Sequence, residues 1–316
     1  MNDQVPARIA NILINALKGG VVPRIGLEYI TVGRAQEIAA ILHDIDMIED
    51  GSASFRFIVG KYGSGKSFLL QTIRNYATAK GFAVVDADLS LERRFAGTTS
   101  RQWYDFLKIF AIFLVSAGYK GLLVVIDELV NIFKIPNSIT RQNNYEKILT
   151  IYNDVLQGKA RHIGFLMGGT PQCIEDKYKG VFSYEALRSR LAEGHFASGD
   201  IKDLSAPIIR LQMLTQEEMY VLVEKLRDIH AQLFRYTPIL SHEDLVYFLT
   251  MEYNRVGADT HITPREIIRD FIELVGILHQ NPHKSAADIL GSNSFEMAKG
   301  GLSDEDIHSD FLEFEV

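Results

Sequence analysis

The chain has 316 residues, of which 47% are hydrophobic and 23% are charged, a composition typical of a folded globular protein. That length exceeds one average domain and accommodates one large domain and a smaller one. The formal net charge of −7 argues against a globally basic nucleic-acid binder, although it leaves a local basic channel open. Cys173 is the only cysteine, which excludes a disulfide framework and a cysteine-based zinc site and fits a reducing, cytoplasmic compartment.

The sequence contains no expected targeting or membrane-spanning segment. The N-terminus carries Asp3 and lacks the sustained apolar core of a signal peptide. The most apolar stretch, residues 106–133, is interrupted by four charged residues, too many for a spanning helix. The nine histidines form no HExxH motif or tight ligand cluster, so a zinc-type catalytic centre is not expected either.

Hydrophobic periodicity predicts helices and strands in alternation along the first two thirds of the chain. In chain order, it predicts helices over 5–18 and 33–49, a strand over 55–59, a helix over 66–79, a strand over 82–87, a helix over 101–117, a strand over 122–127, a helix over 142–157, a strand over 162–167, a helix over 183–192 and a strand over 207–212. Because the strands are continuous apolar runs with helices between them, they indicate an α/β fold with a parallel sheet covered on both faces.

After Met213 the pattern contains helices only, over 215–233, 241–253 and 263–279. The sequence therefore predicts three parts. They are an α/β domain over 1–213 that begins with a helical linker, a small helical domain over 214–282, and a flexible acidic tail over 283–316.

The strand over 55–59 runs into Gly60-x-x-x-x-Gly65-Lys66-Ser67, and an apolar helix pattern follows at once. This order is that of a phosphate-binding loop, in which glycines let backbone N–H groups point at phosphate oxygens and the helix N-terminus adds its positive dipole end. We expect Lys66 to reach the β/γ-phosphates and the Ser67 hydroxyl to hold Mg²⁺. An ordinary glycine-rich turn is the alternative, which the flanking strand and helix disfavour. The predicted contacts to ATP come from Gly60, Tyr62 (as a wall of the site), Gly63, Ser64, Gly65, Lys66, Ser67 and Phe68.

The strand over 122–127 ends in Asp127-Glu128, which is the Walker B arrangement. Ligands of open α/β sheets bind at the carboxyl ends of the strands. We expect Asp127 to hold Mg²⁺, and Glu128 to orient and polarise the attacking water. The alternative is a strand that merely ends in two solvated acids.

Four further residues are candidates, each with an ordinary alternative. In additional-strand ATPases a polar side chain at the end of the strand beside Walker B contacts the γ-phosphate or the attacking water. Thr170 is the candidate for this role. The alternative is a threonine that forms a turn before proline. Arg188 and Arg190 precede the last strand, where they reach a neighbouring subunit's γ-phosphate or form a solvated basic helix face. Arg265 follows the proline that opens a helix of the second domain, and either turns toward the nucleotide or is an ordinary exposed arginine.

Taken together, these features resemble the AAA+ ATPases, and within them the origin-recognition type. The shared features are five strands with the phosphate loop after the first, Walker B at the third, a polar end to the fourth, paired arginines before the fifth, and a helical lid. The resemblance implies a sheet in the order 5-1-4-3-2. It also makes Val32-Gly33-Arg34 look like the linker box that packs by the adenine, which adds Gly33 and Arg34 to the nucleotide contacts.

More narrowly, the chain resembles the BREX (bacteriophage exclusion) ATP-binding family, BrxC/BrxD-like, of prokaryotic phage defence over about residues 5–280. The resemblance is carried by VPRIGLEYITVGR, FRFIVGKYGSGKSFLLQ, VVDADLSLERRFAG, LLVVIDELVNIFK, GFLMGGTP and YEALRSRL. It implies a Mg-ATP-hydrolysing switch or motor in a DNA-associated defence complex, partnered head to tail by itself or a paralogous ATPase and by other defence proteins. The alternative is an ATP-loaded scaffold with slow hydrolysis that recruits a helicase, methyltransferase or nuclease.

The chain departs from this pattern in two places. The family usually carries a long helical stretch after ERRxxG, whereas here only residues 98–102 separate Gly97 from Trp103. A winged helix has no room after the lid, so direct reading of duplex DNA is not implied, and the Arg93-Arg94 pair either meets DNA or lies in a solvated loop. A GTPase is disfavoured because no guanine-reading Asn-Lys-x-Asp occurs. A small-molecule kinase is disfavoured because no phosphoacceptor pocket is evident.

Overall fold

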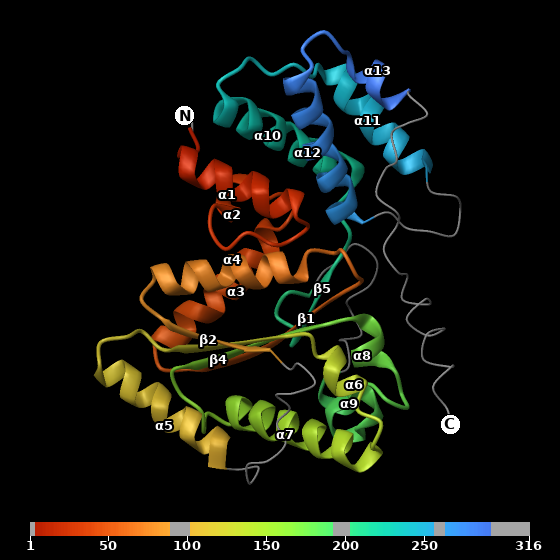
Figure 1. Cartoon of the computed structure of the whole chain (residues 1–316). Coiled ribbons are helices and arrows are strands. Elements are labelled where there is room, and N and C mark those ends of the chain that lie inside the picture. Colours follow the sequence, from red (N-terminus) through yellow and green to blue (C-terminus); the bar gives the residue numbers. More distant parts are fainter. Residues whose placement is uncertain (1–3, 89–101, 192–202, 256–262, 292–316) are drawn as a thin grey trace. The chain divides into compact units, whose positions relative to one another are not determined.

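The computed structural model describes residues 4–88, 102–191, 203–255 and 263–291 (Figure 1). The Arg93-Arg94 pair, most of the short Gly97–Trp103 connection and the tail from residue 292 lie outside these ranges. The described residues fall into two compact units. One unit covers Arg34–Lys61 and Gly65–Gln212, and the other covers the described residues of Met1–Gly33, Tyr62–Ser64 and Met213–Val316. The structure therefore groups residues 4–33 with the C-terminal helices, whereas the sequence predicted that they belong with the sheet.

The first unit is built on a five-stranded parallel sheet. Its strands are β1 (Ala53–Gly60), β2 (Ala83–Asp88), β3 (Leu122–Asp127), β4 (Ile163–Gly169) and β5 (Ile208–Leu211). Their spatial order is β2-β3-β4-β1-β5, which confirms the predicted order read from the opposite edge. The first strand lies inside the sheet, because Phe57 pairs with Met167 of β4 on one side and with Ile208 of β5 on the other.

Helices cover both faces of this sheet, as the apolar strands predict (Figure 1). One face carries α3 (Ala35–Glu49) and α4 (Lys66–Ala79); the other carries α5 (Gln102–Ser116), α7 (Ser138–Leu156) and α9 (Glu185–Leu191). The alternation of β1 shows why both faces are needed. Phe55, Phe57 and Val59 belong to the core beneath α7, while Ile58 belongs to the core beneath α3 and α4.

Three short elements in this unit were not predicted. They are α6 (Val130–Phe133), α8 (Pro171–Glu175) and the 3₁₀ helix η1 (Val181–Ser183). Each is too short to show a helical period in the sequence. Helix α7 begins at Ser138 rather than 142, because the Asn137 side chain accepts a hydrogen bond from the Thr140 N–H and caps the helix there.

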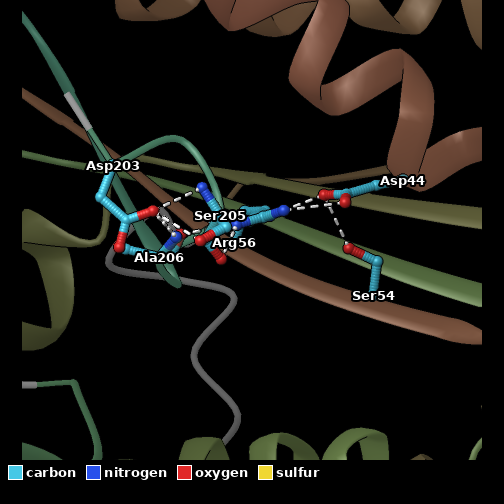
Figure 2. Close-up of polar contacts among 6 residues, drawn as sticks. All are labelled: Asp44, Ser54, Arg56, Asp203, Ser205 and Ala206. Carbon is cyan, nitrogen blue, oxygen red and sulfur yellow. Dashed lines mark hydrogen bonds and ion pairs between the residues drawn. The ribbon is translucent and has the colours of Figure 1, made fainter. Parts of the chain in front are cut away.

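A polar cluster fixes the chain that enters β5 (Figure 2). Arg56 of β1 donates from Nε and Nη2 to both carboxylate oxygens of Asp44, at 2.6 and 2.8 Å. Its Nη1 donates to the carbonyls of Ser205 and Ala206, at 2.7 and 2.6 Å, and Ser54 adds a bond to Asp44 at 3.0 Å. The hydrogen bonds and charge of Asp44 raise the pKa of Arg56. The cluster therefore gives a charged strand residue four hydrogen bonds, two of them to its counterion.

The second unit is helical. It contains α1 (Ala7–Lys18), α2 (Leu27–Ile30), α10 (Gln216–Phe234), α11 (His242–Arg255), α12 (Pro264–Gln280) and α13 (Ala286–Leu290), and α1 packs against α10 and α12. Capping boxes at Thr215, Thr263 and Ser285 set the starts of α10, α12 and α13. Val5 exchanges two backbone hydrogen bonds with the Gln232 side chain, which ties the chain start to α10.

Within the described ranges, no helix combines the length and hydropathy that a membrane crossing requires. Among the same residues, no group of three or more His, Cys, Asp or Glu side chains is arranged to hold a metal ion.

Candidate functional site

The predicted phosphate loop connects β1 to α4. The strand ends at Gly60 and the helix begins at Lys66, with Gly65 as its N-cap. Gly63 and Gly65 both have left-handed backbones, with φ of 77° and 85°. Residues with a Cβ atom rarely adopt this conformation, so the glycines are what allow the chain to turn from strand into helix.

Gly63 is also closely surrounded within its own compact unit. A Cβ atom there would lie 2.8 Å from Thr263 Cβ and 3.4 Å from Pro264 Cδ. These two residues are the N-cap and first residue of α12. Arg265, the predicted lid arginine, comes next and is exposed.

Lys66 and Ser67 make different contacts. The Lys66 ammonium donates to the carbonyls of Gly60 and Lys61, at 2.7 and 2.9 Å. The Ser67 hydroxyl donates to Asp127 Oδ2 at 2.8 Å, so the structure brings the two predicted Mg²⁺ ligands together at the carboxyl edge of the sheet. Two adjacent oxygen donors, one of them a carboxylate, fit a hard cation that prefers oxygen.

The backbone turns sharply directly after Asp127. Glu128 has a left-handed backbone with φ of 58°, which costs a residue with a side chain about 1–2 kcal/mol. Its N–H donates to Asp127 Oδ1 at 2.9 Å, so both oxygens of Asp127 accept a hydrogen bond. Strain of this kind concentrates at functional sites.

Two residues near this turn were missed by the sequence analysis. Gly168 of β4 leaves room for Asp127, because a Cβ atom there would lie 2.6 Å from Asp127 Oδ1. Asn131 of α6 donates to Glu128 Oε2 at 3.4 Å. The sequence signal for Gly168 was the Gly168-Gly169 pair at the end of an apolar strand. No sequence signal pointed to Asn131.

Thr170 forms the N-cap of α8. Its hydroxyl accepts the Cys173 N–H at 3.3 Å, and the side chain is only 8% exposed. This geometry matches the ordinary alternative, a threonine that starts a turn before proline. Burial raises the pKa of the Cys173 thiol to about 11.

Arg188 and Arg190 lie on the last turn of α9 and are exposed. Arg190 Nη1 donates to the Ala186 carbonyl at 2.8 Å, and Arg188 lies 3.9 Å from Glu185 within the same helix. Exposure on a helix surface is compatible with a contact to another subunit and equally with a solvated face.

The predicted adenine-side residues are engaged in packing. Gly33 has a φ of 68°, a backbone conformation that favours glycine, and a Cβ atom there would also displace the Glu218 carboxylate, whose Oε1 would lie 2.2 Å away. The Arg34 side chain is buried and donates to the Gln212 carbonyl at 2.6 Å, just past the end of β5. The other predicted contacts differ in exposure: Tyr62 is 56% exposed, Phe68 is half-buried and Ser64 is buried.

Two solved structures have similar folds. The Aeropyrum pernix ORC1 protein in complex with DNA aligns with a TM-score of 0.51 and 12% identity, over 96% of this chain and 69% of that one. A chain of the E. coli MS115-1 HORMA:CdnC:Trip13 complex aligns with a TM-score of 0.56 and 14% identity, over 87% of this chain and 92% of that one. At such identities the similarity shows the fold alone, a parallel sheet covered by helices. No curated protein matches the chain in sequence.

A family model shows closer kinship. The model described as "BREX system ATP-binding protein BrxC/D" matches residues 5–102 and 98–294. The two segments meet at residues 98–102, where the sequence analysis finds the shortened connection. Together they cover well over half of the sequence, and the chain therefore belongs to the BREX system ATP-binding protein BrxC/D family.

Proposed function

We propose that the protein binds ATP with Mg²⁺ and hydrolyses it, as an AAA+ switch or motor of a BREX-type phage-defence assembly. The observation that carries this proposal is the contact between Ser67 and Asp127 at 2.8 Å, beside the strained Glu128. It joins the end of the phosphate loop to the end of β3 at the sheet edge where α/β proteins bind ligands. Family membership supports ATP as the nucleotide.

The residues have distinct roles in this proposal. Backbone N–H groups of the loop and the α4 N-terminus cradle the phosphates, and Lys66 leaves the Gly60 and Lys61 carbonyls to contact the β- and γ-phosphates. Ser67 and Asp127 hold Mg²⁺, which supplies neutralisation of phosphate charge. Glu128 orients the attacking water and accepts its proton. Gly33, Arg34 and Arg265 are the proposed contacts on the adenine and lid sides.

The direct test of nucleotide binding is isothermal titration of Mg-ATP into the parent chain and Lys66→Ala. The variant should lose binding, because the phosphates lose their cationic partner in a partly dehydrated site. Lys159→Ala is the matched control, since this lysine is 63% exposed and lies in the connection that leads into the start of β4. Binding of ATP by Lys66→Ala at parental strength would reject the phosphate-loop assignment.

A scaffold with slow hydrolysis is the second candidate. Thr170 favours it, because this residue was predicted to contact the γ-phosphate or the attacking water. Its hydroxyl instead accepts a hydrogen bond as a helix cap, and the residue is buried. The two candidates differ in one measurement, the turnover of saturating Mg-ATP. A rate that stays low at high protein concentration, and with DNA or partner proteins present, would favour the scaffold.

We further propose that ATP promotes head-to-tail association with a second copy or a paralogous ATPase, with Arg188 or Arg190 acting on the neighbour's γ-phosphate. Exposure of both side chains on the last turn of α9 supports this. Heterologous contacts of this kind close into rings or continue as spirals.

The test of assembly is light scattering and specific ATPase rate across a dilution series. Arg190→Ala should keep ATP binding and lose turnover, and mixing it with Lys66→Ala should restore some activity at mixed interfaces. A monomer that hydrolyses ATP at one specific rate at every concentration would exclude the assembly. Repeating the series with DNA tests the proposed site of action, which we place in the cytoplasm, on or near DNA and beside other defence proteins.

A further inference from the structure

The loop between α8 and η1 presents an aromatic ring between two cations. Tyr178 is 87% exposed, the largest exposed fraction among the large apolar and aromatic side chains of the described residues. Its neighbours Lys177 and Lys179 are exposed as well. A single exposed ring is common on protein surfaces, and what distinguishes this one is that it is exposed over most of its area and stands between two cations.

The backbone beneath this ring is firmly anchored. Asp176 Oδ1 accepts the N–H groups of Tyr178 and Lys179, at 2.7 and 2.8 Å, and the Asp176 carbonyl accepts the Gly180 N–H at 3.0 Å. From the core, the buried Tyr145 of α7 donates its hydroxyl to the Lys179 carbonyl at 2.7 Å. These hydrogen bonds therefore fix the backbone from which the exposed ring projects.

Glycine is required at the end of the loop. A Cβ atom at Gly180 would lie 2.7 Å from the Asp176 carbonyl oxygen and 3.0 Å from that of Ile174. A rigid presenting loop loses little conformational entropy when it binds, which strengthens each contact that it makes.

The local charge is positive. The Asp176 carboxylate is turned toward the loop's own backbone, and the neighbouring Glu175 forms an ion pair with Arg210 of β5. The nearby Glu185 is 89% exposed and lies 3.9 Å from Arg188. Lys179 interacts electrostatically with the Asp176 carboxylate, yet Lys177 and Lys179 together still give the loop more positive than negative charge, although the whole chain has a net charge of −7.

We infer that the Lys177-Tyr178-Lys179 loop binds single-stranded nucleic acid, with the tyrosine ring stacked on an unpaired base and the lysines on the flanking phosphates. An exposed aromatic ring with adjacent cations is the combination that single-strand binders use, because every base has a face to stack on and every nucleotide a phosphate. The bases of a duplex are already stacked, so a ring on a short loop has no free base face there. The inference rests on the proposed association with DNA and does not depend on ATP hydrolysis.

The test is fluorescence anisotropy with a labelled oligo(dT) of about 20 nucleotides and the full chain. Tyr178→Ala should weaken binding about 5- to 150-fold, the loss expected for one stacked base. Tyr178→Phe keeps the ring and should bind like the parent. The double variant Lys177→Ala with Lys179→Ala should reduce the slope of log affinity against log salt by about 1.4, or about 0.7 for each phosphate lost.

The matched control is Tyr119→Ala. This tyrosine is 46% exposed and precedes Lys120, but it lies just before the start of β3, whereas the Tyr178 loop follows the end of β4. Parental affinity in Tyr119→Ala together with the losses above supports the inference. It is overturned if the parent does not bind the oligonucleotide, if it binds a duplex of equal length more tightly, or if Tyr178→Ala binds like the parent. A Tyr178→Phe variant as weak as Tyr178→Ala overturns the stacking. Titration of ATP into the same samples shows whether the nucleotide site fails separately.

Discussion

Two polar clusters on one sheet differ in how many hydrogen bonds their charged groups make. The first surrounds Arg56 in the middle of β1, where the guanidinium makes four hydrogen bonds and both members of its ion pair with Asp44 are about one-eighth exposed (Figure 2). The second lies at the carboxyl edge, where Ser67 and Glu128 are exposed and Glu128 has a strained backbone. Both include charged residues in or beside an apolar strand.

The difference indicates what each cluster does. A largely buried ion pair whose guanidinium already makes four hydrogen bonds has little capacity left for a ligand, and it fixes the chain around it. An exposed carboxylate held by one 3.4 Å contact can change partners, which chemistry at that edge requires. The predictions below test this division, because each variant should affect either turnover or stability and leave the other nearly unchanged.

The largest effect is expected for Glu128→Gln. Mg-ATP binding should persist while turnover falls by about 10²–10⁴, the usual share of general base catalysis. The urea midpoint of unfolding should not fall, because the exposed carboxylate supports no core packing. Steady-state ATPase assays and urea titrations measure the two, with the exposed Glu146→Gln of α7 as the control. An unchanged rate would remove Glu128 from the mechanism.

Asp44→Ala should do the reverse. It leaves the Arg56 charge buried without its carboxylate, which costs about 3–5 kcal/mol of unfolding free energy. Asp46→Ala on the same helix is the control, because its ion pair with Lys80 is largely exposed and is worth about 0–1 kcal/mol. Urea unfolding of both variants measures the difference. Equal losses of unfolding free energy would mean that the Arg56 cluster stabilises the fold no more than an exposed ion pair does.

A third polar cluster extends the comparison to the helical unit. His230 is 4% exposed, and its Nδ1 lies 2.7 Å from the Tyr236 hydroxyl. Burial, with the charges of His279 and Lys18, lowers the pKa of His230 to about 4. Because this value lies below that of an unfolded histidine, the stabilisation is fully present above pH 6.5 and is lost as the pH falls toward 4. The expected loss is about 3 kcal/mol.

The measurement is the urea midpoint between pH 7 and 4 for the parent and His230→Phe. Replacement by an apolar ring should flatten the profile in this window. The exposed His43→Ala should keep the parental profile. A parental slope in His230→Phe would assign the pH dependence to other groups.

Much of the fold could be predicted because its signals are local. The five strands are apolar runs, and the phosphate loop is a contiguous motif, so both are visible without tertiary contacts. The grouping of residues 4–33 with α10 and α12 could not be predicted, since it depends on which apolar faces meet. Helices of four or five residues, such as α6 and α8, carry no period to detect.

The candidate site was only partly visible for the same reason. Ser67 and Asp127 were predicted as partners because each belongs to a known motif, although they lie far apart in sequence. The spacing role of Gly168 depends on the distance between β3 and β4, and the backbone of Glu128 depends on the turn after β3. Arg56 reads in the sequence as an interruption of an apolar strand, and only the approach of Asp44 explains it.

The smallest and sharpest test compares two single hydrogen-bond donors. Asn131→Ala removes the 3.4 Å contact to Glu128, and Ser54→Ala removes the 3.0 Å contact to Asp44. Each donor supports one carboxylate, and each is worth about 1 kcal/mol. The first should change turnover by a few fold and leave the urea midpoint in place. The second should lower unfolding free energy by about 1 kcal/mol and leave turnover in place. If Asn131→Ala lowered stability and left turnover unchanged, its contact would belong with the structural cluster, and the division between the Arg56 cluster and the cluster at the carboxyl edge would fail.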